Sequence, residues 1–166
     1  GTVIVQPWNE FEILEETVKR EAKNIAAIVT EPIMCDNGVL PPKEGYLEFL
    51  RELCDKYGIV LIFDEVKAGF RIARGGAAER FRVSPDISAY AKAMSNGYPI
   101  AGFGGKREIM KLMAPGGSVP HGGTYNSNPI ATAAAIATLD ELAKDELWEG
   151  FERRGQELMD GVKQIL

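Results

Sequence analysis

The order of hydrophobic and polar positions along the chain predicts strands that alternate with helices. Residues 25–29 and 59–63 are short, continuous apolar runs, which is typical of strands buried on both faces. Elsewhere, apolar residues recur at the spacing of one helix face; they are Phe11, Leu14, Val18 and Ala22 in one segment and Leu47, Leu50 and Cys54 in another. This alternation favours an α/β fold with a largely parallel sheet.

Turn and cap residues set the expected boundaries of these elements. Asn9 is predicted to be a helix N-cap, with Glu12 as its capping-box partner. Gly58 is a typical helix stop, and Pro129 suits the first position of a helix. The expected strands are residues 2–5, 25–29, 59–63, 86–91 and 100–104. One expected helix starts after Asn9, and the other expected helices span residues 44–57, 77–81, 106–113, 129–144 and 145–166. We therefore expect a mostly parallel sheet with flanking helices.

Composition narrows the class of protein. The 166 residues are 45% hydrophobic and 26% charged, as in ordinary globular domains. The net charge is −5, and the absence of a basic stripe argues against nucleic-acid binding, which needs clustered Lys and Arg. The apolar runs are too short to cross a bilayer, and residues 1–10 lack the pattern of a signal peptide.

Residues that form disulfides or bind metals are scarce. Cys35 and Cys54 are too few for a disulfide framework, and neither shows metal-ligand spacing. His121 is the only histidine, which leaves little for a histidine-based metal site or a Ser-His-Asp triad. We therefore expect a cytoplasmic protein without a metal site.

Three polar residues, Glu31, Asp64 and Lys92, stand where predicted strands end. Ligands of open α/β sheets bind beyond the carboxyl ends of the strands, so these positions are candidates for a binding site. A carboxylate at a strand end also serves as a helix cap or loop anchor, and each residue taken singly allows that simpler interpretation.

Asp64 continues a buried strand, where an unpaired charge is costly. Strand alternation places it on the same face as Val60 and Ile62. Either a neighbouring arginine, Arg71 or Arg74, pairs with its carboxylate, or a protonated ring nitrogen of a ligand does.

Lys92 ends a run of mostly uncharged residues. Either the strand stops early and exposes the lysine, or the lysine is drawn into a site. Partial burial favours the neutral amine, which is competent to form a Schiff base.

Four segments together resemble the class III aminotransferases, a family of fold-type I pyridoxal-phosphate enzymes. Their order and spacing agree with the family over nearly the whole chain; they are residues 30–33 (TEPI), 63–71 (FDEVKAGFR), 85–99 (PDISAYAKAMSNGYP) and 123–129 (GTYNSNP). Residues 96–99 and the general register resemble the branch of the glutamate-1-semialdehyde aminomutases. The resemblance implies that the chain is part of the large domain of such an enzyme.

The resemblance also implies roles for individual residues. Lys92 would bind the aldehyde of pyridoxal 5'-phosphate as a Schiff base and later move a proton, and Asp64 would keep the ring nitrogen protonated. Val66 would pack on the ring face, and Thr124 would donate to the phosphate of a neighbouring subunit. That arrangement implies a homodimer with shared active sites, acting on a small amine or amino acid.

The match leaves parts of such an enzyme unaccounted for. Residues 1–144 correspond to the C-terminal half of the cofactor-binding domain, and residues 145–166 to a helix that leads toward a small C-terminal domain. The phosphate-binding turn and an arginine for a substrate carboxylate have no counterpart, so we expect a fragment, or a chain that works with another. Transaminase and aminomutase both remain open, as does a catalytically incompetent structural or oligomerisation module. The glycine loop at 115–118 lacks the pattern of a nucleotide-binding loop.

Overall fold

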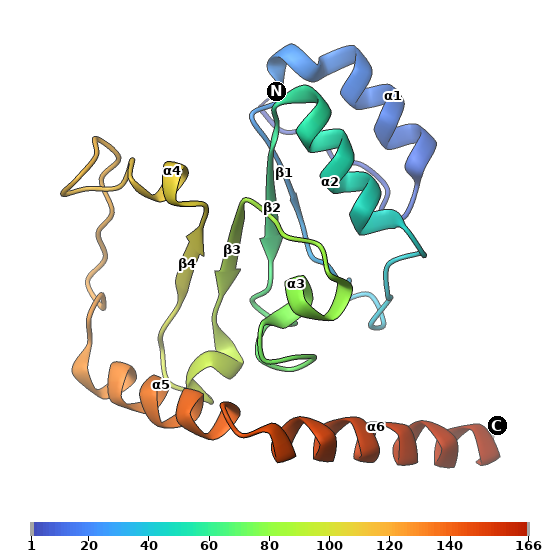
Figure 1. Ribbon diagram of the computed structural model, residues 1–166, viewed down its shortest axis with the longest axis vertical. Helices are drawn as coiled ribbons and strands as arrows, with labels where there is room; N and C mark the ends of the chain where they lie inside the picture. Colours follow the sequence, from blue (N-terminus) through green and yellow to red (C-terminus); the bar gives the residue numbers. More distant parts are fainter. Residues whose placement is uncertain (1, 166) are drawn as a thin grey trace.

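A four-stranded mixed sheet forms the centre of the computed structural model, which describes residues 2–165 (Figure 1). Its strands are β1 (Ala27–Thr30), β2 (Val60–Asp64), β3 (Ile87–Tyr90) and β4 (Gly102–Gly105), and they lie in the order β1-β2-β3-β4. The first three strands are parallel, and β4 runs antiparallel to β3. The predicted α/β fold with a mostly parallel sheet is confirmed.

Helices connect the strands, as the alternation of patterns predicts. They are α1 (Phe11–Glu21), α2 (Tyr46–Tyr57), α3 (Gly76–Phe81), α4 (Arg107–Met110), α5 (Pro129–Leu142) and α6 (Asp145–Ile165), with 3-10 turns η1 (Ala22–Asn24) and η2 (Lys92–Ser95). Gly58 ends α2 in a left-handed conformation, and its N–H donates to the carbonyl of Cys54. The side chain of Asn128 caps α5 by accepting from the N–H groups of Ile130 and Ala131. Both predicted boundaries are confirmed.

Two predictions for the N-terminal segment are wrong. Residues 2–5 form no strand, and the side chains of Val3 and Val5 are exposed. Asn9 does not cap α1, whose N-cap is Glu10 and has no side-chain hydrogen bond. The side chain of Asn9 instead accepts from the N–H of Lys43 at 2.9 Å and donates to the carbonyl of Pro41 at 3.2 Å. A contact with a loop more than thirty residues away thus replaces the predicted local capping box.

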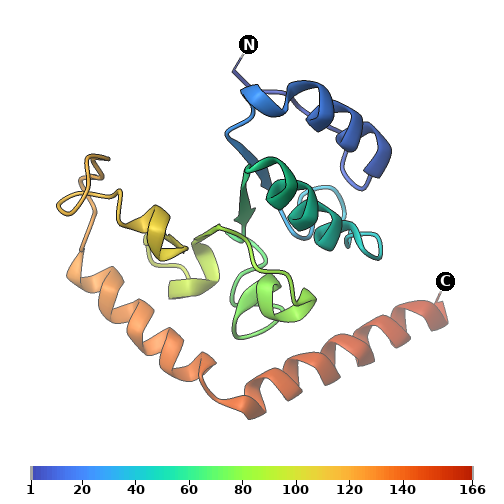
Figure 2. The same ribbon diagram turned by 45° about the horizontal axis from the view of Figure 1, so that its top comes forward.

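The hydrophobic core lies between the helix pair α1 and α2 and one face of the sheet (Figures 1 and 2). Leu61 and Phe63 of β2 point into it and are fully buried, and they alternate with Val60, Ile62 and Asp64 on the other face. The helices contribute buried side chains that include Leu14, Val18, Leu47, Leu50 and Leu53. This packing fixes the strand whose last residue is Asp64.

The opposite face of the sheet is much less covered. Val29 in the middle of β1 is 65% exposed, and Phe103 of β4 is 41% exposed. The prediction that β1 is buried on both faces is therefore wrong for residues 2–165, because α1 and α2 cover only one face. The register pairs Asp64 with Ala89 and Ala89 with Phe103, so these three residues lie in one row across the sheet.

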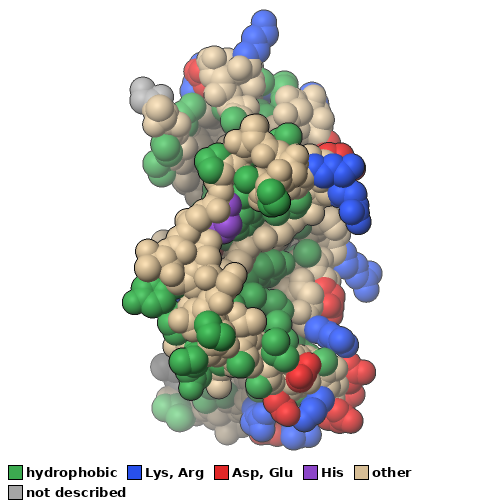
Figure 3. Space-filling model, turned by 90° about the vertical axis from the view of Figure 1, so that its left-hand side faces the viewer, with side chains coloured by type: hydrophobic (Ala, Val, Ile, Leu, Met, Phe, Trp, Pro, Cys, Tyr) green, Lys and Arg blue, Asp and Glu red, His purple; other side chains and the backbone are tan. Residues whose placement is uncertain are grey.

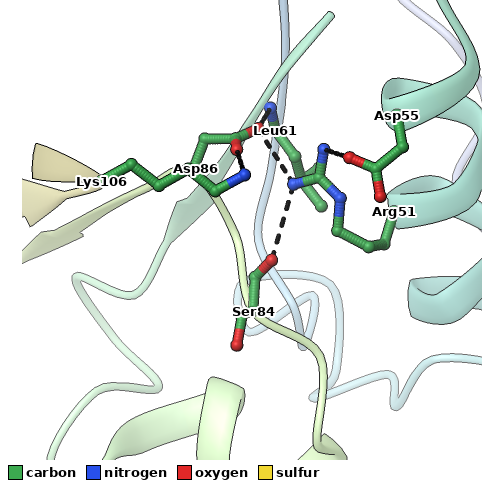
Figure 4. Close-up of polar contacts among 6 residues, drawn as sticks. All are labelled: Arg51, Asp55, Leu61, Ser84, Asp86 and Lys106. Carbon is green, nitrogen blue, oxygen red and sulfur yellow. Dashed lines mark hydrogen bonds and ion pairs between the residues drawn. The ribbon is translucent and has the colours of Figure 1, made fainter. Parts of the chain in front are cut away.

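A buried carboxylate, Asp86, directly precedes β3 and connects it with β2, α2 and the residue after β4 (Figure 4). Its Oδ2 accepts from the Leu61 N–H at 2.7 Å and from Arg51 of α2 at 2.9 Å, and its Oδ1 accepts from Lys106 at 2.6 Å. Burial tends to raise the pKa of Asp86. The hydrogen bonds from Lys106, the Leu61 amide and Arg51 outweigh burial and hold the pKa below its usual range.

Neither membrane crossing nor metal clustering is indicated by residues 2–165. None of their helices has both the length and the apolar character that crossing a bilayer requires. Their His, Cys, Asp and Glu side chains form no group of three or more that could hold a metal ion.

Candidate functional site

The three polar residues at predicted strand ends lie along one edge of the sheet. Glu31 directly follows β1, Asp64 is the last residue of β2, and Lys92 comes two residues after β3. Because β1, β2 and β3 are parallel, their carboxyl ends meet at the same edge. This agrees with the expected position of a ligand site in an open α/β sheet.

The Asp64 carboxylate is half-buried and turned back toward the chain. Its Oδ1 accepts from the N–H of Val66 at 3.0 Å, which fixes the first turn after β2. Asp64 forms no ion pair within residues 2–165, so neither Arg71 nor Arg74 neutralises it as the simpler interpretation predicted. A half-buried carboxylate without a cation is suited to a cationic group of a ligand.

Lys92 begins η2 and is exposed, so the strand does stop early. It nevertheless lines an open cleft of about 990 Å³ between η2, the segment after β2, and helices α5 and α6. Other residues of this cleft are Phe70, Arg71, Tyr98, Glu141 and Phe151. Of the two alternatives for Lys92, the structure shows the exposed lysine after a strand that stops early, and this lysine lines the cleft without being buried in it.

The backbone of Lys92 is strained. Its φ of 49° lies in the left-handed region, which costs a residue with a side chain about 1–2 kcal/mol. Such strain persists where the surrounding structure enforces it, and it often occurs at functional sites. The strained residue is thus the one that leads from β3 into η2 and lines the cleft.

This strain predicts an unusual order of stabilities. Lys92→Gly should have a free energy of unfolding about 1 kcal/mol higher than Lys92→Ala, because glycine adopts a positive φ without a Cβ clash. Urea unfolding of the two variants measures the difference. Lys111 has a φ of −62° and is the matched control, because there alanine should be the more stable substitution. The same order at both positions would contradict strain at Lys92.

The segment from residue 66 to residue 76 forms one wall of the cleft. The ring of Phe70 packs on Tyr90 of β3 with centroids 5.3 Å apart, and Arg71 lies beside it at the cleft. Lys67 forms an ion pair with Asp36 of the preceding loop. The segment therefore contacts the loop after β1 and the last residue of β3, and β1 and β3 are the strands on either side of β2.

The loop after β1 is held by Glu31. Its Oε2 accepts from the N–H of Cys35 at 3.2 Å. Burial and the nearby Glu31 carboxylate raise the pKa of the Cys35 thiol. Glu31 and Cys35 thus form a local anchor at the same edge as Asp64.

Thr124 is separate from the other candidates. It is exposed in the turn that precedes α5, and it does not line the cleft of Lys92. This turn follows the long loop beyond β4, on the side of the sheet away from β1 (Figure 1). Figure 3 looks onto that side, where uncharged atoms predominate and charged side chains lie mainly along the right-hand and lower margins. Within this chain, Asp64 and Lys92 share an edge of the sheet, and Thr124 does not join them.

Sequence patterns missed one residue of this edge. Glu65 directly follows Asp64, is fully buried, and accepts from the N–H of Ala77 at 2.6 Å. A charged residue in the middle of a motif carries no local sign of burial, because its partners are backbone amides. The sequence did contain one sign of this burial, the glycines Gly69 and Gly76, because glycine lets the backbone approach a neighbouring group closely.

The chemical capacity of the edge follows from its groups. A lysine amine can attack a carbonyl carbon and later accept or return a proton. A carboxylate without a cation can hold a protonated ring nitrogen. Together they suit a cofactor that carries both a carbonyl and a basic ring.

Comparison with known proteins identifies the family of the chain. A family model described as "Aminotransferase class-III" matches residues 6–166. A glutamate-1-semialdehyde 2,1-aminomutase of Syntrophobacter fumaroxidans is 45% identical over 157 residues, which are 95% of this chain and 36% of that protein. The chain therefore spans little more than a third of the length of the curated relatives it matches.

Solved structures show the same partial match. An omega-transaminase from Sphaerobacter thermophilus superposes with a TM-score of 0.93 at 34% identity, over 99% of this chain and 38% of that chain. A transaminase structure with PLP bound gives a TM-score of 0.80 at 34% identity, over 86% of this chain and 34% of that chain. The predicted fold class, part of a fold-type I transaminase, is confirmed.

Proposed function

The chain belongs to the class-III aminotransferase family, and from that premise we propose that it is the lysine-bearing part of an enzyme that moves an amino group with pyridoxal 5'-phosphate. The observation that carries the proposal is that two groups lie at the same edge of the sheet. They are the Asp64 carboxylate, which forms no ion pair within residues 2–165, and the Lys92 amine, which lines the cleft. The chain spans little more than a third of its relatives' length, so the activity of the whole enzyme is part of the proposal.

The residues at this edge fit the cofactor. Asp64 presents a carboxylate on the less covered face of the sheet, where a ring nitrogen could be held. Lys92 presents a primary amine, the group that binds an aldehyde. When bound, the cofactor withdraws electrons from the substrate carbon that carries the amine. Val66 is half-buried, and its N–H donates to the Asp64 carboxylate. We propose that its side chain packs on the face of a ring that Asp64 holds.

Each residue has a defined task in the proposal. Asp64 keeps the ring nitrogen protonated, because its negative charge favours the cation. Lys92 would hold the cofactor through its Nζ, and the same amine, once free, would accept a proton from the substrate carbon and deliver it to the cofactor. Thr124 donates to the phosphate in a neighbouring subunit, so the proposed enzyme is a homodimer. This assignment fits the exposure of Thr124 and its absence from the cleft of Lys92.

We propose aminomutase chemistry of the glutamate-1-semialdehyde type ahead of intermolecular transamination. The support is the 45% identity to the Syntrophobacter fumaroxidans protein, against 34% to the omega-transaminase. In this proposal residues 1–144 are the second half of the cofactor-binding domain, and residues 145–166 lead toward a small domain. The free thiols of Cys35 and Cys54 fit a reducing cytoplasm, which we propose as the location.

A rebuilt enzyme tests the proposal. In it, this chain replaces the segment of the Syntrophobacter fumaroxidans protein that it matches. We expect borohydride reduction to attach the cofactor to Lys92, as measured by peptide mass spectrometry, and glutamate 1-semialdehyde to be converted without an added amino donor. Dependence on a donor, with release of a keto acid, would indicate a transaminase. Absence of both cofactor attachment and activity would favour the alternative that the segment serves only as a structural module.

Asp64→Asn in the rebuilt enzyme should lower the rate of amine transfer about a hundredfold. The amide has nearly the same shape but cannot stabilise a protonated ring nitrogen. Steady-state rates and the absorbance spectrum of the bound cofactor measure the effect. Asp140→Asn is the control, because Asp140 is an exposed carboxylate of α5 that forms no ion pair within residues 2–165 and does not line the cleft. A rate for Asp64→Asn that stays near that of the unsubstituted enzyme would remove Asp64 from its proposed role.

A further inference from the structure

Glu65 is a fully buried glutamate at the carboxyl edge of the sheet. Its N–H donates to the Ala89 carbonyl at 2.9 Å, which extends the pairing of β2 with β3. Its carbonyl accepts from the Gly69 N–H at 2.8 Å, and its Oε2 accepts from the Ala77 N–H at 2.6 Å. One residue therefore bonds to Gly69, near the beginning of the segment from 66 to 76, and to Ala77, directly after its end.

Two glycines allow this close approach. A Cβ on Gly69 would lie 2.7 Å from the Glu65 carbonyl oxygen and 2.7 Å from Cδ1 of Tyr90. A Cβ on Gly76 would collide with the Glu65 carboxylate, and the φ of 67° at Gly76 also disfavours a side chain. The two ends of the segment thus pack against Glu65 more closely than any other residue type permits.

The surroundings of Glu65 differ from those of the other buried carboxylate, Asp86. Asp86 is neutralised by Arg51 and Lys106, whereas Glu65 forms no ion pair within residues 2–165, and its Oε1 has no hydrogen-bond partner. Burial raises the pKa of Glu65. Within residues 2–165, only backbone amides donate to its side chain. The side chain is therefore suited to fix the position of the main chain that carries those amides.

We propose that Glu65 is a positioning residue that clamps both ends of the segment 66–76 and thereby sets the wall of the cleft that contains Lys92. Its importance for catalysis rests on the proposed function, whereas the clamp itself does not. Arg71 and Phe70 belong to the clamped segment and line the cleft together with Lys92. Phe70 packs on Tyr90, which lies two residues before Lys92. A shift of the segment would therefore change the packing of the strand that leads to Lys92.

Limited trypsin digestion of the 166-residue chain tests the clamp without any cofactor. The segment contains three trypsin sites, after Lys67, Arg71 and Arg74. Glu65→Ala should speed cleavage at these sites about tenfold relative to cleavage after Arg153 in α6, as expected for the loss of one buried hydrogen bond. Glu65→Gln should stay within about threefold of the unsubstituted chain, because its amide oxygen can still accept from the Ala77 N–H.

Control variants make the digestion decisive. Glu52→Ala removes an exposed glutamate of α2 and should change nothing. Gly76→Ala should also speed cleavage of the segment, and should add less in combination with Glu65→Ala than it does alone, because the collision with the carboxylate is then absent and only the cost of the positive φ remains. Unchanged cleavage in Glu65→Ala overturns the clamp. A uniform rise at every site also overturns it, because Glu65 would then hold the whole domain. If the unsubstituted chain is cut uniformly, the same comparison is made in the rebuilt enzyme.

The rebuilt enzyme separates positioning from loss of folded protein. Glu65→Ala should raise KM for the amine substrate several-fold and change kcat less, because the displaced wall weakens substrate binding. A merely smaller folded fraction lowers the apparent kcat and leaves KM unchanged, and that outcome would count against positioning. If the cofactor attaches to Lys92 but protection of the segment from trypsin does not depend on Glu65, the clamp is overturned and the proposed function stands. If protection depends on Glu65 but the cofactor does not attach, the proposed function is overturned and the clamp stands.

Discussion

Replacing Lys92 with alanine in the rebuilt enzyme is expected to lower the rate of amine transfer at least about ten-thousand-fold. The substitution removes both the amine that binds the cofactor aldehyde and the base that moves the substrate proton. Steady-state assays measure the rate, and borohydride reduction followed by mass spectrometry measures covalent attachment, which should disappear. The fold should persist, because Lys92 is exposed and forms no ion pair within residues 2–165.

Lys111→Ala is the matched control for this loss. Lys111 is also an exposed lysine, but it lies beyond β4 and outside the cleft. It should keep nearly the full rate and full attachment at Lys92. If Lys92→Ala retained about a tenth of the rate or more, another lysine would have to carry the cofactor.

Asp86→Ala is expected to lower the free energy of unfolding by about 3–5 kcal/mol, the usual cost of removing one partner from a buried ion pair. The Asp86 side chain is 8% exposed and that of Arg51 is 17% exposed, so the guanidinium would lose its partner in a poorly hydrated place. The buried N–H of Leu61 would also lose its acceptor. Urea unfolding measures the change.

The neighbouring carboxylate Asp55 is the control for Asp86. It also pairs with Arg51, at 2.7 Å, but is 61% exposed, so Asp55→Ala should cost less than about 1 kcal/mol. Equal costs for the two variants would show that burial does not set the strength of this network.

The contribution of Asp86 also depends on pH. Its folded-state pKa lies below the ordinary value of 3.8. The unfolded chain therefore binds its proton first, and stability falls as pH is lowered through that window. The contribution is fully present above about pH 4 and disappears once the pH passes below the folded-state pKa. Unfolding measured from pH 6 to pH 2 should show a smaller difference between the unsubstituted chain and Asp86→Asn at the acid end.

Local patterns predicted the elements that carry chemistry. The strand ends at Asp64 and Lys92 could be predicted because the strand preceding Asp64 has a continuous apolar core and Lys92 interrupts a run of uncharged residues. The end of α2 at Gly58 and the start of α5 at Pro129 could be predicted because these residues act on the backbone of their own neighbours. These features depend on residues no more than about four positions apart.

Features that depend on distant residues were missed. Asn9 bonds to a loop more than thirty positions away, so the capping-box pattern of Asn9 and Glu12 led to a wrong prediction. The exposure of Val29 depends on which face of the sheet the helices cover, and no periodicity within β1 encodes that. Glu65 accepts from an amide twelve positions away, so nothing beside it in the sequence revealed its burial.

The position of the hydrophobic core along the chain has a consequence for local stability. Every residue of the core cluster between α1, α2 and the sheet lies between positions 8 and 83. Neither η2 nor α5 contributes a residue to this cluster, so both can open without exposing it. Native-state hydrogen exchange should therefore show stronger protection of the amides of α1, α2 and β2 than of those of η2.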